Sequence, residues 1–385
     1  MILDFDVDDP QLALAAWSRI CEPGDQDAVR LVKAAGPSAA LQWLLNPSTP
    51  TGPSSNGLDR ALARWAPRLE GLDPRRELRV LQSLGGRLLA PGEPNWPAGL
   101  DDLGEAAPLC LWQWAPADLD LGAWCGRSVA VIGSRACTHY GATVTATMVN
   151  ELTSAGWCVV SGGAFGIDAA AHQAALAVGG QTVAVMAGGV DRLYPAANED
   201  MLRQVAQQGA VISELPPGSA PRRERFLDRN RLIAAMTRLT VVVESGWRSG
   251  AHRTAAVAAE LLRPVAAVPG PVTAAASAGC HRLIREGIAT LVTGADQVIE
   301  LLAQLGQAPE PLTDCPSGPL DGLSQPERRV YDALPLRGTA PVSRLVAASG
   351  LATAQVLGAL SRLERSGRAD TTGGRWRRTT PTKPR

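Results

Sequence analysis

The sequence predicts an α/β protein whose centre is a doubly wound, mostly parallel sheet. Short runs of apolar, mostly β-branched residues alternate with helical patterns through the middle of the chain, as in sheets whose parallel strands are joined by helices. Small residues follow several of these runs, where a ligand-binding edge is expected. The expected strands cover residues 129–132, 157–160, 182–186, 210–214, 239–243 and 264–268.

The first of these strands, residues 129–132, is the clearest, because four apolar residues run directly into the turn Gly133-Ser134. A helical pattern over residues 140–152 follows it. Backbone N–H groups at the start of such a helix favour an anion, and Arg135 can grip a phosphate with two N–H groups. The turn lacks the full G-x-G-x-x-G spacing, so an ordinary strand–helix turn is the alternative.

Similar small residues follow other expected strands, at Ser161-Gly162-Gly163, Gly188-Gly189 and Ser245-Gly246. The carboxyl ends of parallel strands meet at one edge of a sheet, so several such turns favour a ligand groove there. Arginines gather in the sequence beside this edge, and a solvated charged face is the alternative for the first three: Arg222, Arg223, Arg225, Arg229, Arg231, Arg238, Arg248 and Arg253.

The segment Arg229-Asn230-Arg231 is expected to open a helix over residues 232–236. In that position Asn230 can cap the helix or donate to a phosphate, and the two arginines supply positive charge. Phe226 precedes this segment by three residues and can stack on a nucleic-acid base, although a core position explains it equally well.

Two later segments add donors to the same edge. Arg248-Ser249-Gly250 follows the fifth expected strand and opens a helix, supplying hydroxyl, N–H and guanidinium groups. Residues 279–284 open the last helix of the sheet region in a similar way and contribute Arg282.

Catalytic interpretations have weaker support. His172 has no serine or cysteine nucleophile at a recognisable spacing and suits a packing or capping role, while Asp168 lies at a helix start, where a carboxylate caps N–H groups. No paired carboxylates, metal-ligand cluster or Walker lysine is found; Lys33 and Lys383 are the only lysines. We therefore expect no enzyme activity, no metal and no cofactor.

The composition limits which partners and which cellular compartment are expected. The 385 residues are 45% hydrophobic and 19% charged, with no net charge, so any basic patch must be local. Seven cysteines show no C-x-x-C pair, which indicates reduced thiols of a cytoplasmic protein. The acidic start shows no signal-peptide pattern and no apolar run is long enough to cross a bilayer, so no membrane association is expected.

The flanking regions predict further domains. Residues 1–72 read as a small helical domain of the sterile-alpha-motif or helix-hairpin-helix type; its G-x-G hairpin is absent, which favours packing or partner contact over DNA contact. Residues 73–306 form the sheet domain, which residues 87–90 and 109–112 extend. Residues 307–319 read as a Pro-rich linker. Residues 320–380 read as three helices and a hairpin, a winged helix that binds either DNA or protein.

Motifs spaced along the sheet region resemble those of the DNA-processing protein A family, also called DprA or Smf. Residues 1–72 and 320–380 also fit this family. The matching motifs are Trp96-Pro97, Val129 to Arg135, Ser161 to His172, Gly188 to Asn198 with Tyr194-Pro195, Ser213-Glu214 with Pro216-Pro217-Gly218, Phe226 with Arg229-Asn230-Arg231, Arg248-Ser249-Gly250, and Gly279-Cys280 with Arg282-Leu283-Ile284.

The resemblance implies a Rossmann-like domain that binds single-stranded DNA without known catalysis. It also implies a homodimer that loads RecA recombinase onto incoming strands during natural transformation. Phe226 would meet a base, and phosphate contacts would come from Ser134, Arg135, Ser161, Gly162, Gly163, Arg229, Asn230, Arg231 and Ser249. The predicted site also includes Gly133, Gly166, Arg248, Gly250 and Arg282.

Two positions depart from the family pattern. The family usually has Arg where this chain has Phe165, and Asn where it has His281. Either change can weaken binding, whereas Phe165 can instead add a stacking face. The alternative function is a Rossmann-type nucleotide-phosphate hydrolase. That class carries P-G-G-x-G-T, which Pro269-Gly270-Pro271 does not match.

Overall fold

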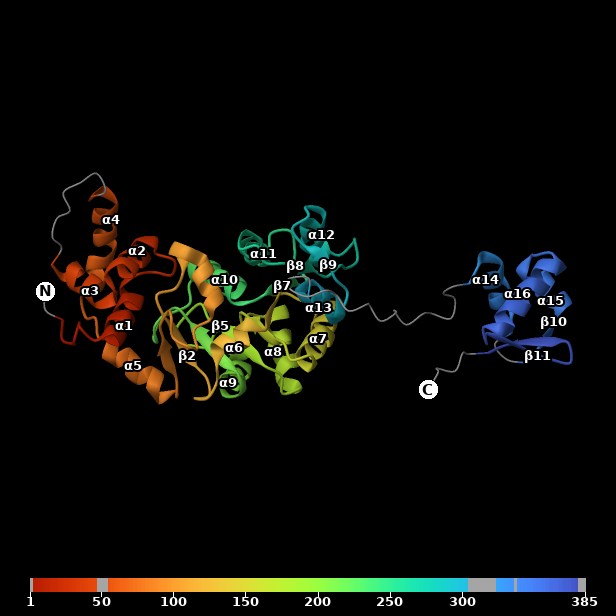
Figure 1. Cartoon of the computed structure of the whole chain (residues 1–385), viewed down its shortest axis with the longest axis horizontal. Coiled ribbons are helices and arrows are strands. Elements are labelled where there is room, and N and C mark those ends of the chain that lie inside the picture. The colour runs from red at the N-terminus through yellow and green to blue at the C-terminus, as the bar shows by residue number, and fades with distance from the viewer. Residues whose placement is uncertain (1–2, 47–54, 304–322, 336–337, 380–385) are drawn as a thin grey trace. The chain divides into compact units, whose positions relative to one another are not determined.

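The computed structural model describes residues 3–46, 55–303, 323–335 and 338–379 (Figure 1). These residues form two compact units, Met1–Ala308 and Pro309–Arg385. The predicted linker at residues 307–319 lies outside the described residues.

The first unit contains a nine-stranded sheet with the order β1-β2-β6-β5-β4-β3-β7-β8-β9. Pairs from β6 to β9 are parallel, whereas β1 pairs with β2, and β2 with β6, in antiparallel fashion. The six predicted strands and the extension of the sheet are confirmed. The strands are β1 (Arg87–Leu89), β2 (Leu111–Trp114), β3 (Ser128–Ile132), β4 (Cys158–Ser161), β5 (Thr182–Val185), β6 (Ala210–Ser213), β7 (Leu239–Val242), β8 (Val265–Ala267) and β9 (Thr290–Leu291).

The helices of this unit begin and end as follows: α1 (Pro10–Ile20), α2 (Gln26–Ala35), α3 (Pro37–Leu45), α4 (Ser55–Trp65), α5 (Pro74–Ser83), α6 (Leu121–Gly126), α7 (His139–Ser154), α8 (Ile167–Ala177), α9 (Glu199–Gln208), α10 (Arg223–Met236), α11 (Ala251–Glu260), α12 (Ala278–Arg285) and α13 (Ala295–Ala303). Short 3-10 helices are η1 (Ala66–Arg68), η2 (Ala98–Ala106), η3 (Ala196–Asn198) and η4 (Ala275–Ser277). Residues 279–284 were expected in the last helix of this region. They lie in α12, but α13 follows it.

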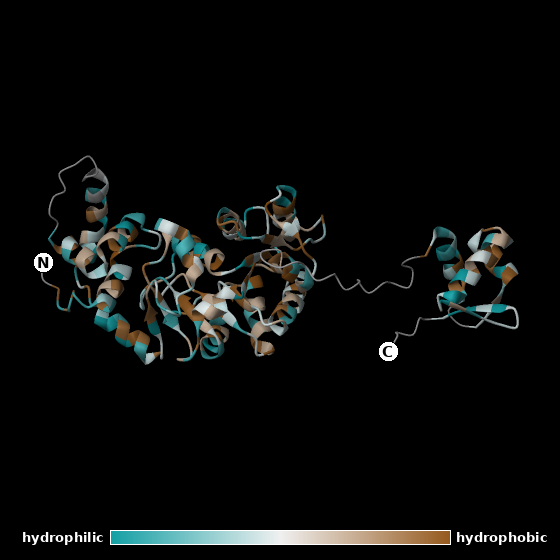
Figure 2. Cartoon of the chain, in the orientation of Figure 1, coloured by the Kyte–Doolittle hydropathy of each residue, from teal (hydrophilic) through white to brown (hydrophobic). Residues whose placement is uncertain are grey.

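Helices cover both faces of the sheet, because side chains alternate along each strand. On β3, Val129 and Val131 pack with α7, α8 and α13, whereas Ala130 and Ile132 pack with α10, α11 and α12. Figure 2 shows hydrophobic and hydrophilic segments alternating along the helices, as expected when one side of each helix faces the sheet. The doubly wound arrangement is confirmed.

The N-terminal helices share a hydrophobic core with one end of the sheet. Trp17 of α1 is fully buried and meets Trp65 edge-on, with 5.4 Å between ring centroids. The same cluster includes Trp112 of β2 and Leu202 of α9. Trp112 Nε1 also donates to Ser18 Oγ at 3.2 Å. The predicted boundary at residue 72 stays a prediction.

The second unit contains α14 (Gln325–Ala333), α15 (Val342–Ser349) and α16 (Thr353–Arg365), and a sheet of order β10-β12-β11. Its strands are β10 (Ala340–Pro341), β11 (Ala369–Thr372) and β12 (Arg375–Arg378). The predicted capping box is present, with Ser324 N–H donating to Glu327 Oε2 at 2.6 Å. These are the expected helices and hairpin, and the winged-helix assignment stays a prediction.

Among the described residues, no single helix has the length and apolar character needed to cross a membrane. The pair Val342–Ser349 and Thr353–Arg365, bent by 106°, meets those criteria only when the two helices are taken together.

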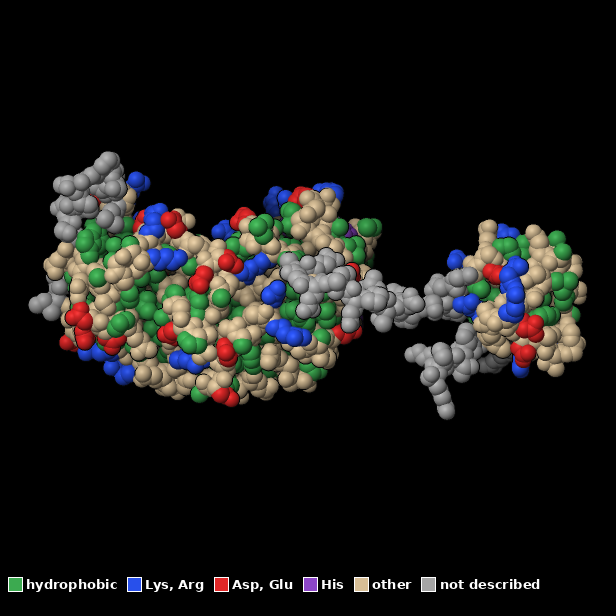
Figure 3. Space-filling model, viewed as in Figure 1, with side chains coloured by type: hydrophobic (Ala, Val, Ile, Leu, Met, Phe, Trp, Pro, Cys, Tyr) green, Lys and Arg blue, Asp and Glu red, His purple; other side chains and the backbone are tan. Residues whose placement is uncertain are grey.

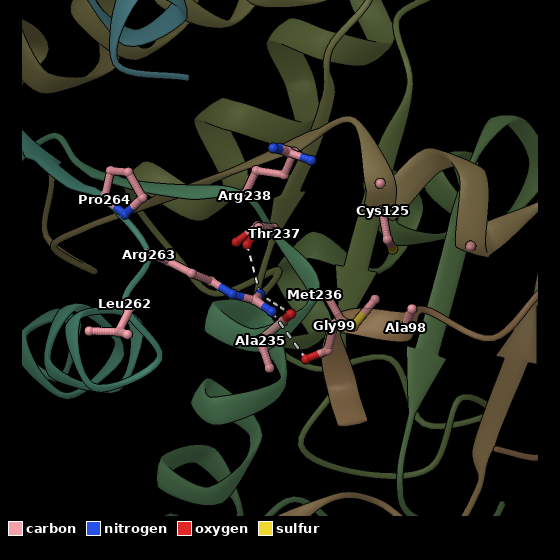
Figure 4. A pocket seen from close by; sticks show the side chains of 12 residues that line it. Ala98, Gly99, Cys125, Ala235, Met236, Thr237, Arg238, Leu262, Arg263 and Pro264 are labelled. Atoms are coloured by element: carbon pink, nitrogen blue, oxygen red, sulfur yellow. Dashed lines mark hydrogen bonds between the residues drawn. The ribbon is translucent and has the colours of Figure 1, made fainter. Parts of the chain in front are cut away.

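A cavity of about 280 Å³ opens at the amino-terminal edge of the sheet, before β7 and β8 (Figure 4). Arg263 crosses it, and its Nη1 donates at 2.8 Å to the carbonyl oxygens of Ala234 and Thr237, at the end of α10. Its Nη2 donates at 3.1 Å to Gly99 of η2. This guanidinium therefore links α10 to η2. We interpret the residues around the cavity as a structural contact between these two elements.

Candidate functional site

The order of the strands predicts where a ligand can bind. From β3 the chain builds the sheet toward β6 and then returns to place β7 on the other side of β3. Ligands of open α/β sheets bind beyond the carboxyl ends of strands at such a reversal. A pocket of about 580 Å³ lies there, lined by Ile132, Gly133, Ser134, Arg135, Ala136, Ala164, Asp168, Arg229, Asn230, Ile233, Gly246, Arg248, Ser249, Gly250, Ala251 and Thr254.

The pocket has a positive balance, since three arginines and one aspartate line it. Elsewhere the charges are mixed: Figure 3 shows basic and acidic side chains interspersed over the visible face of the molecule. The chain has no net charge, so this positive lining is a local feature of one edge of the sheet.

The turn after β3 is fixed by its neighbours. Ser134 N–H donates to the carbonyl oxygen of Glu244 at 2.7 Å, and Ile167 N–H donates to Ser134 O at 3.1 Å. A Cβ on Gly133 would lie 2.6 Å from Ile167 Cγ1, which explains the glycine. The turn thus joins the loops after β3 and β7 and presents Arg135, which is exposed, at the pocket.

Arg229 occupies a different place from the one expected. We predicted that Arg229-Asn230-Arg231 opens a helix, but α10 begins at Arg223, so this segment lies inside the helix and Asn230 caps nothing. Arg229 is only 5% exposed, and its Nη1 donates to the carbonyl oxygens of Gly162, at 2.7 Å, and of Val185. Burial lowers its pKa to about 10, which leaves it charged at neutral pH.

The neighbours of Arg229 point in different directions. Asn230 lines the pocket and accepts from Arg229 Nε at 3.2 Å. Arg231 does not line the pocket; its Nη2 lies 2.7 Å from Glu214 Oε1, and both side chains are largely buried. Arg225 is likewise paired, with Glu22 at 2.9 Å. Part of the arginine-rich segment is therefore neutralised by ion pairs within the protein.

The residues after β4 shape the edge from inside. Ser161 is fully buried and its hydroxyl donates to Val131 O at 2.7 Å. A Cβ on Gly162 would lie 2.2 Å from Arg229 Nη1, and one on Gly166 would lie 2.1 Å from Ser134 O. Gly163 has a φ of +66°. These four residues lie outside the pocket lining and allow the loops to pack closely.

The start of α11 faces the pocket. Ser249 Oγ accepts from Ala251 N–H at 3.3 Å, and Arg248 beside it is exposed. Gly250, Ala251 and Thr254 continue the lining along the first turn. The positive end of the α11 dipole, together with a guanidinium, suits an anionic ligand; the N–H groups of Ala251, His252 and Arg253 themselves donate to Ser249 and Gly250.

Aromatic side chains lie beside the pocket. The Arg135 guanidinium carbon sits 5.0 Å from the centroid of Phe226, and Tyr194 packs on the same ring at 5.7 Å. Tyr194 and Phe165 are each 47% exposed. The sequence suggested stacking for Phe226 and for Phe165. Tyr194 entered only as part of the motif Tyr194-Pro195, which gave no sign that its ring is exposed.

The remaining predicted residues take supporting positions. Asp168 lies in the first turn of α8, where its Oδ2 accepts from Gly162 N–H at 3.2 Å; burial raises its pKa. His172 is fully buried, with Nδ1 2.8 Å from Thr182 Oγ1, and burial lowers its pKa to about 3, so the packing interpretation is confirmed. In the described part of the chain, no group of three or more His, Cys, Asp or Glu could hold a metal.

A family model described as DNA recombination-mediator protein A matches residues 87–303, which include every strand of the large sheet. The chain belongs to this family. It is 45% identical over 384 residues to the DprA protein of Mycobacterium tuberculosis, covering 96% of this chain and 95% of that protein. It is 38% identical over 205 residues to DprA of Streptococcus pneumoniae, covering 53% of this chain and 71% of the relative.

Solved structures agree with this assignment. The Streptococcus pneumoniae DprA structure matches with a TM-score of 0.61 at 29% identity, covering 77% of this chain and 98% of that chain. A Helicobacter pylori DNA processing protein A, whose structure addresses its single-stranded DNA binding mode, matches with a TM-score of 0.50 at 27% identity. That match covers 57% of this chain and 96% of the Helicobacter protein. The resemblance of the sequence motifs to this family is thus confirmed.

Proposed function

We propose that the chain binds single-stranded DNA at the pocket between the ends of β3 and β7. The observation that carries the proposal is the combination, at the reversal of strand order, of exposed Arg135 and Arg248 with the positive end of the α11 dipole. A phosphate backbone requires such donors. The family membership and the Helicobacter pylori relative support the same ligand.

The aromatic residues favour a single strand over a duplex. Phe226 and Tyr194 lie beside Arg135, and a base reaches an aromatic face only when it is free of its neighbours in a helix. Stacking accepts any base, so we expect weak sequence preference and strong salt dependence.

The residues proposed to contact phosphates differ in how far a DNA strand can reach them. Arg135, Asn230, Arg248 and Ser249 line the pocket directly, with Gly133 and Gly250 allowing close approach of the strand. Arg229 also lines the pocket, but it is only 5% exposed, so in our proposal it contributes charge more than direct contact. In our proposal the other predicted residues act through the shape of the loops or through an ion pair, because Ser161, Gly162, Gly163 and Arg231 are buried and Gly166 packs against Ser134 O.

The wider role follows from the family. In our proposal the protein is a cytoplasmic homodimer without catalysis that protects incoming single strands and loads RecA recombinase onto them during transformation. RecA filament growth on DNA covered by single-strand binding protein tests loading: addition of the chain should shorten the delay before filaments form, and an unchanged delay would remove this part of the proposal.

For the second unit we propose a separate role: a winged helix that contacts protein or DNA. Its third helix, α16, carries Arg362, but this side chain is paired with Glu327 of α14. Arg365 is the other arginine of α16, and it is exposed. Deletion of residues 320–385 tests the assignment: unchanged DNA affinity would favour a protein partner.

Fluorescence anisotropy with labelled oligo-dT and a matching duplex tests the binding site. We expect Arg135→Ala and Arg248→Ala each to weaken single-strand binding. The matched control is Arg203→Ala, an exposed arginine on α9 that pairs with Glu199 and lies outside the pocket lining. If all three variants lost single-strand affinity equally, or none of them did, the DNA site would lie elsewhere on the protein. Release of base or phosphate from nucleoside monophosphates would instead favour the hydrolase alternative.

A further inference from the structure

An exposed tryptophan stands at the edge of the proposed DNA site. Trp247 lies in the loop between β7 and α11, between Gly246 and Arg248, which both line the pocket. It is 52% exposed. All ten tryptophans of the chain lie among the described residues, and Trp247 is the one that is exposed. Core packing therefore does not explain this side chain.

The ring is held in place by the neighbouring helix. The Arg282 guanidinium carbon lies 5.1 Å from the centroid of the Trp247 ring. On its other side Arg282 is fixed by Glu286, with 2.8 Å between Nε and Oε1. The guanidinium covers one face of the indole and brings a positive charge next to it, which is the environment that a stacked nucleotide prefers.

The loop that carries the ring is also braced. Ser245 N–H donates to Ala276 O at 2.8 Å, and Gly279 N–H donates to Ser245 O at 2.6 Å. The loop thus rests on η4 and the start of α12. A rigid aromatic face loses little freedom when a ligand stacks on it, so a braced loop suits a binding platform.

We propose that Trp247, oriented by Arg282, is a base-stacking platform of this protein, separate from Phe226. The inference rests on the proposed function. Phe226 belongs to α10 and contacts Arg135 and Tyr194, whereas Trp247 belongs to the loop before α11 and contacts Arg282. A strand whose phosphates meet Arg248 and the start of α11 places a neighbouring base within reach of Trp247.

The platform accounts for the position of Arg282. The sequence placed Arg282 in the DNA site, but this residue does not line the pocket. Its contact with Trp247 gives it a positioning role, with its charge available to the phosphate of the stacked nucleotide.

Replacement of the ring tests the proposal. Because Trp247→Ala removes the stacking of one base, it should weaken oligo-dT binding by roughly 5- to 150-fold. Trp247→Phe should retain most of the affinity, because a π-face remains, whereas Trp247→Leu should lose it despite its apolar side chain. Arg282→Gln should give a smaller loss. Thermal unfolding of each variant checks that the fold is retained.

The chain offers a matched control. Arg127 and Trp157 form another arginine–tryptophan pair, also with 5.1 Å between the guanidinium carbon and the ring centroid. They precede β3 and β4, at the opposite edge of the sheet. Trp157→Leu and Arg127→Gln should leave DNA affinity unchanged.

Photocrosslinking gives a readout that a merely structural role would not move. Oligo-dT containing 5-iodouracil should crosslink to a peptide that contains Trp247 in the wild-type protein. If Trp247→Ala and Trp247→Leu bind like the wild type and no such crosslink forms, the platform is refuted while the pocket stands, provided that Arg135→Ala still weakens binding. If the wild type binds no single strand, the proposed function itself fails.

Discussion

The guanidinium of Arg229, on α10, donates a hydrogen bond of 2.7 Å to the carbonyl oxygen of Gly162, in the loop after β4. The same guanidinium reaches Val185 O at the end of β5. One buried arginine therefore holds the ends of two strands and α10 together. Arg229 lines the pocket with little exposed surface, so we expect it to contribute to DNA binding through the shape of the site as well as through its charge.

Arg229→Met should lower the free energy of unfolding by about 3 kcal/mol, because two buried carbonyl oxygens lose their donor. Urea unfolding measures the change. Arg248→Met removes the same charge from an exposed position and should stay within about 0.5 kcal/mol of the wild type. Equal stability of the two variants would contradict the structural role of Arg229.

Arg135→Gln should change the salt dependence of binding as well as the affinity. When a protein neutralises one phosphate fewer on a single strand, the slope of log K against log salt becomes less negative by about 0.7. Anisotropy titrations across a salt series measure the slope. Arg203→Gln, which removes a charge from α9, should leave the slope as in the wild type. An unchanged slope in Arg135→Gln would exclude a phosphate contact at this residue.

Leu262→Gly should raise the free energy of unfolding by about 0.5–1 kcal/mol. Leu262 has a φ of +56°, which is strained for a residue with a Cβ, and it is 90% exposed, so its side chain contributes little burial. Chemical denaturation measures the gain. Val272 is 89% exposed but is not among the residues with positive φ. Val272→Gly should therefore give no gain, and a gain in both variants would refute the strain argument.

Glu22→Gln should reduce the loss of stability in acid. Burial raises the pKa of Glu22, but hydrogen bonds from Arg225 and Arg68 outweigh it and hold the pKa below its ordinary value. A depressed pKa contributes stability above the unfolded value of about 4.3, and this stability is lost as the pH falls through the folded pKa. The side chain is 39% exposed, so the effect should not exceed about 1 kcal/mol.

Urea midpoints of the wild type and Glu22→Gln, measured from pH 7 down to pH 3, test this prediction. The difference between the two proteins should be largest at pH 7 and shrink below about pH 4. Glu199→Gln, at a more exposed ion pair on α9, is the control. A difference that does not vary with pH would mean that Glu22 acts through packing alone.

The strands of the central sheet could be predicted because they are buried on both faces. Residues 129–132 are a continuous apolar run, and residues 239–243 contain only Thr240 as a polar residue, a pattern typical of buried parallel strands. The glycines after β3 and β4 marked the edge at which the pocket lies, because strand ends and tight turns leave a local signal. The location of Arg135 and Arg248 at the pocket followed from this edge.

The start of α10 could not be predicted, because residues 223–231 are charged or polar except for Phe226 and Leu227 and so lack the amphipathic spacing of a surface helix. This helix buries arginines through partners far away in the sequence. Glu214, which neutralises Arg231, and Gly162, which accepts from Arg229, lie on other elements. Their pairing depends on how the helix packs against the sheet.

The sequence by itself therefore determined the sheet, the edge at which the pocket lies and the family, because these leave local patterns of hydrophobicity, glycine and motif spacing. Only the tertiary structure decided which arginines remain free for a ligand. Arg135 and Arg248 are exposed, Arg225 and Arg231 are paired with acids, and Arg229 is buried against carbonyl oxygens. The physical reason is that a guanidinium is neutralised by whichever acceptor the fold places beside it, and sequence distance does not report that neighbour.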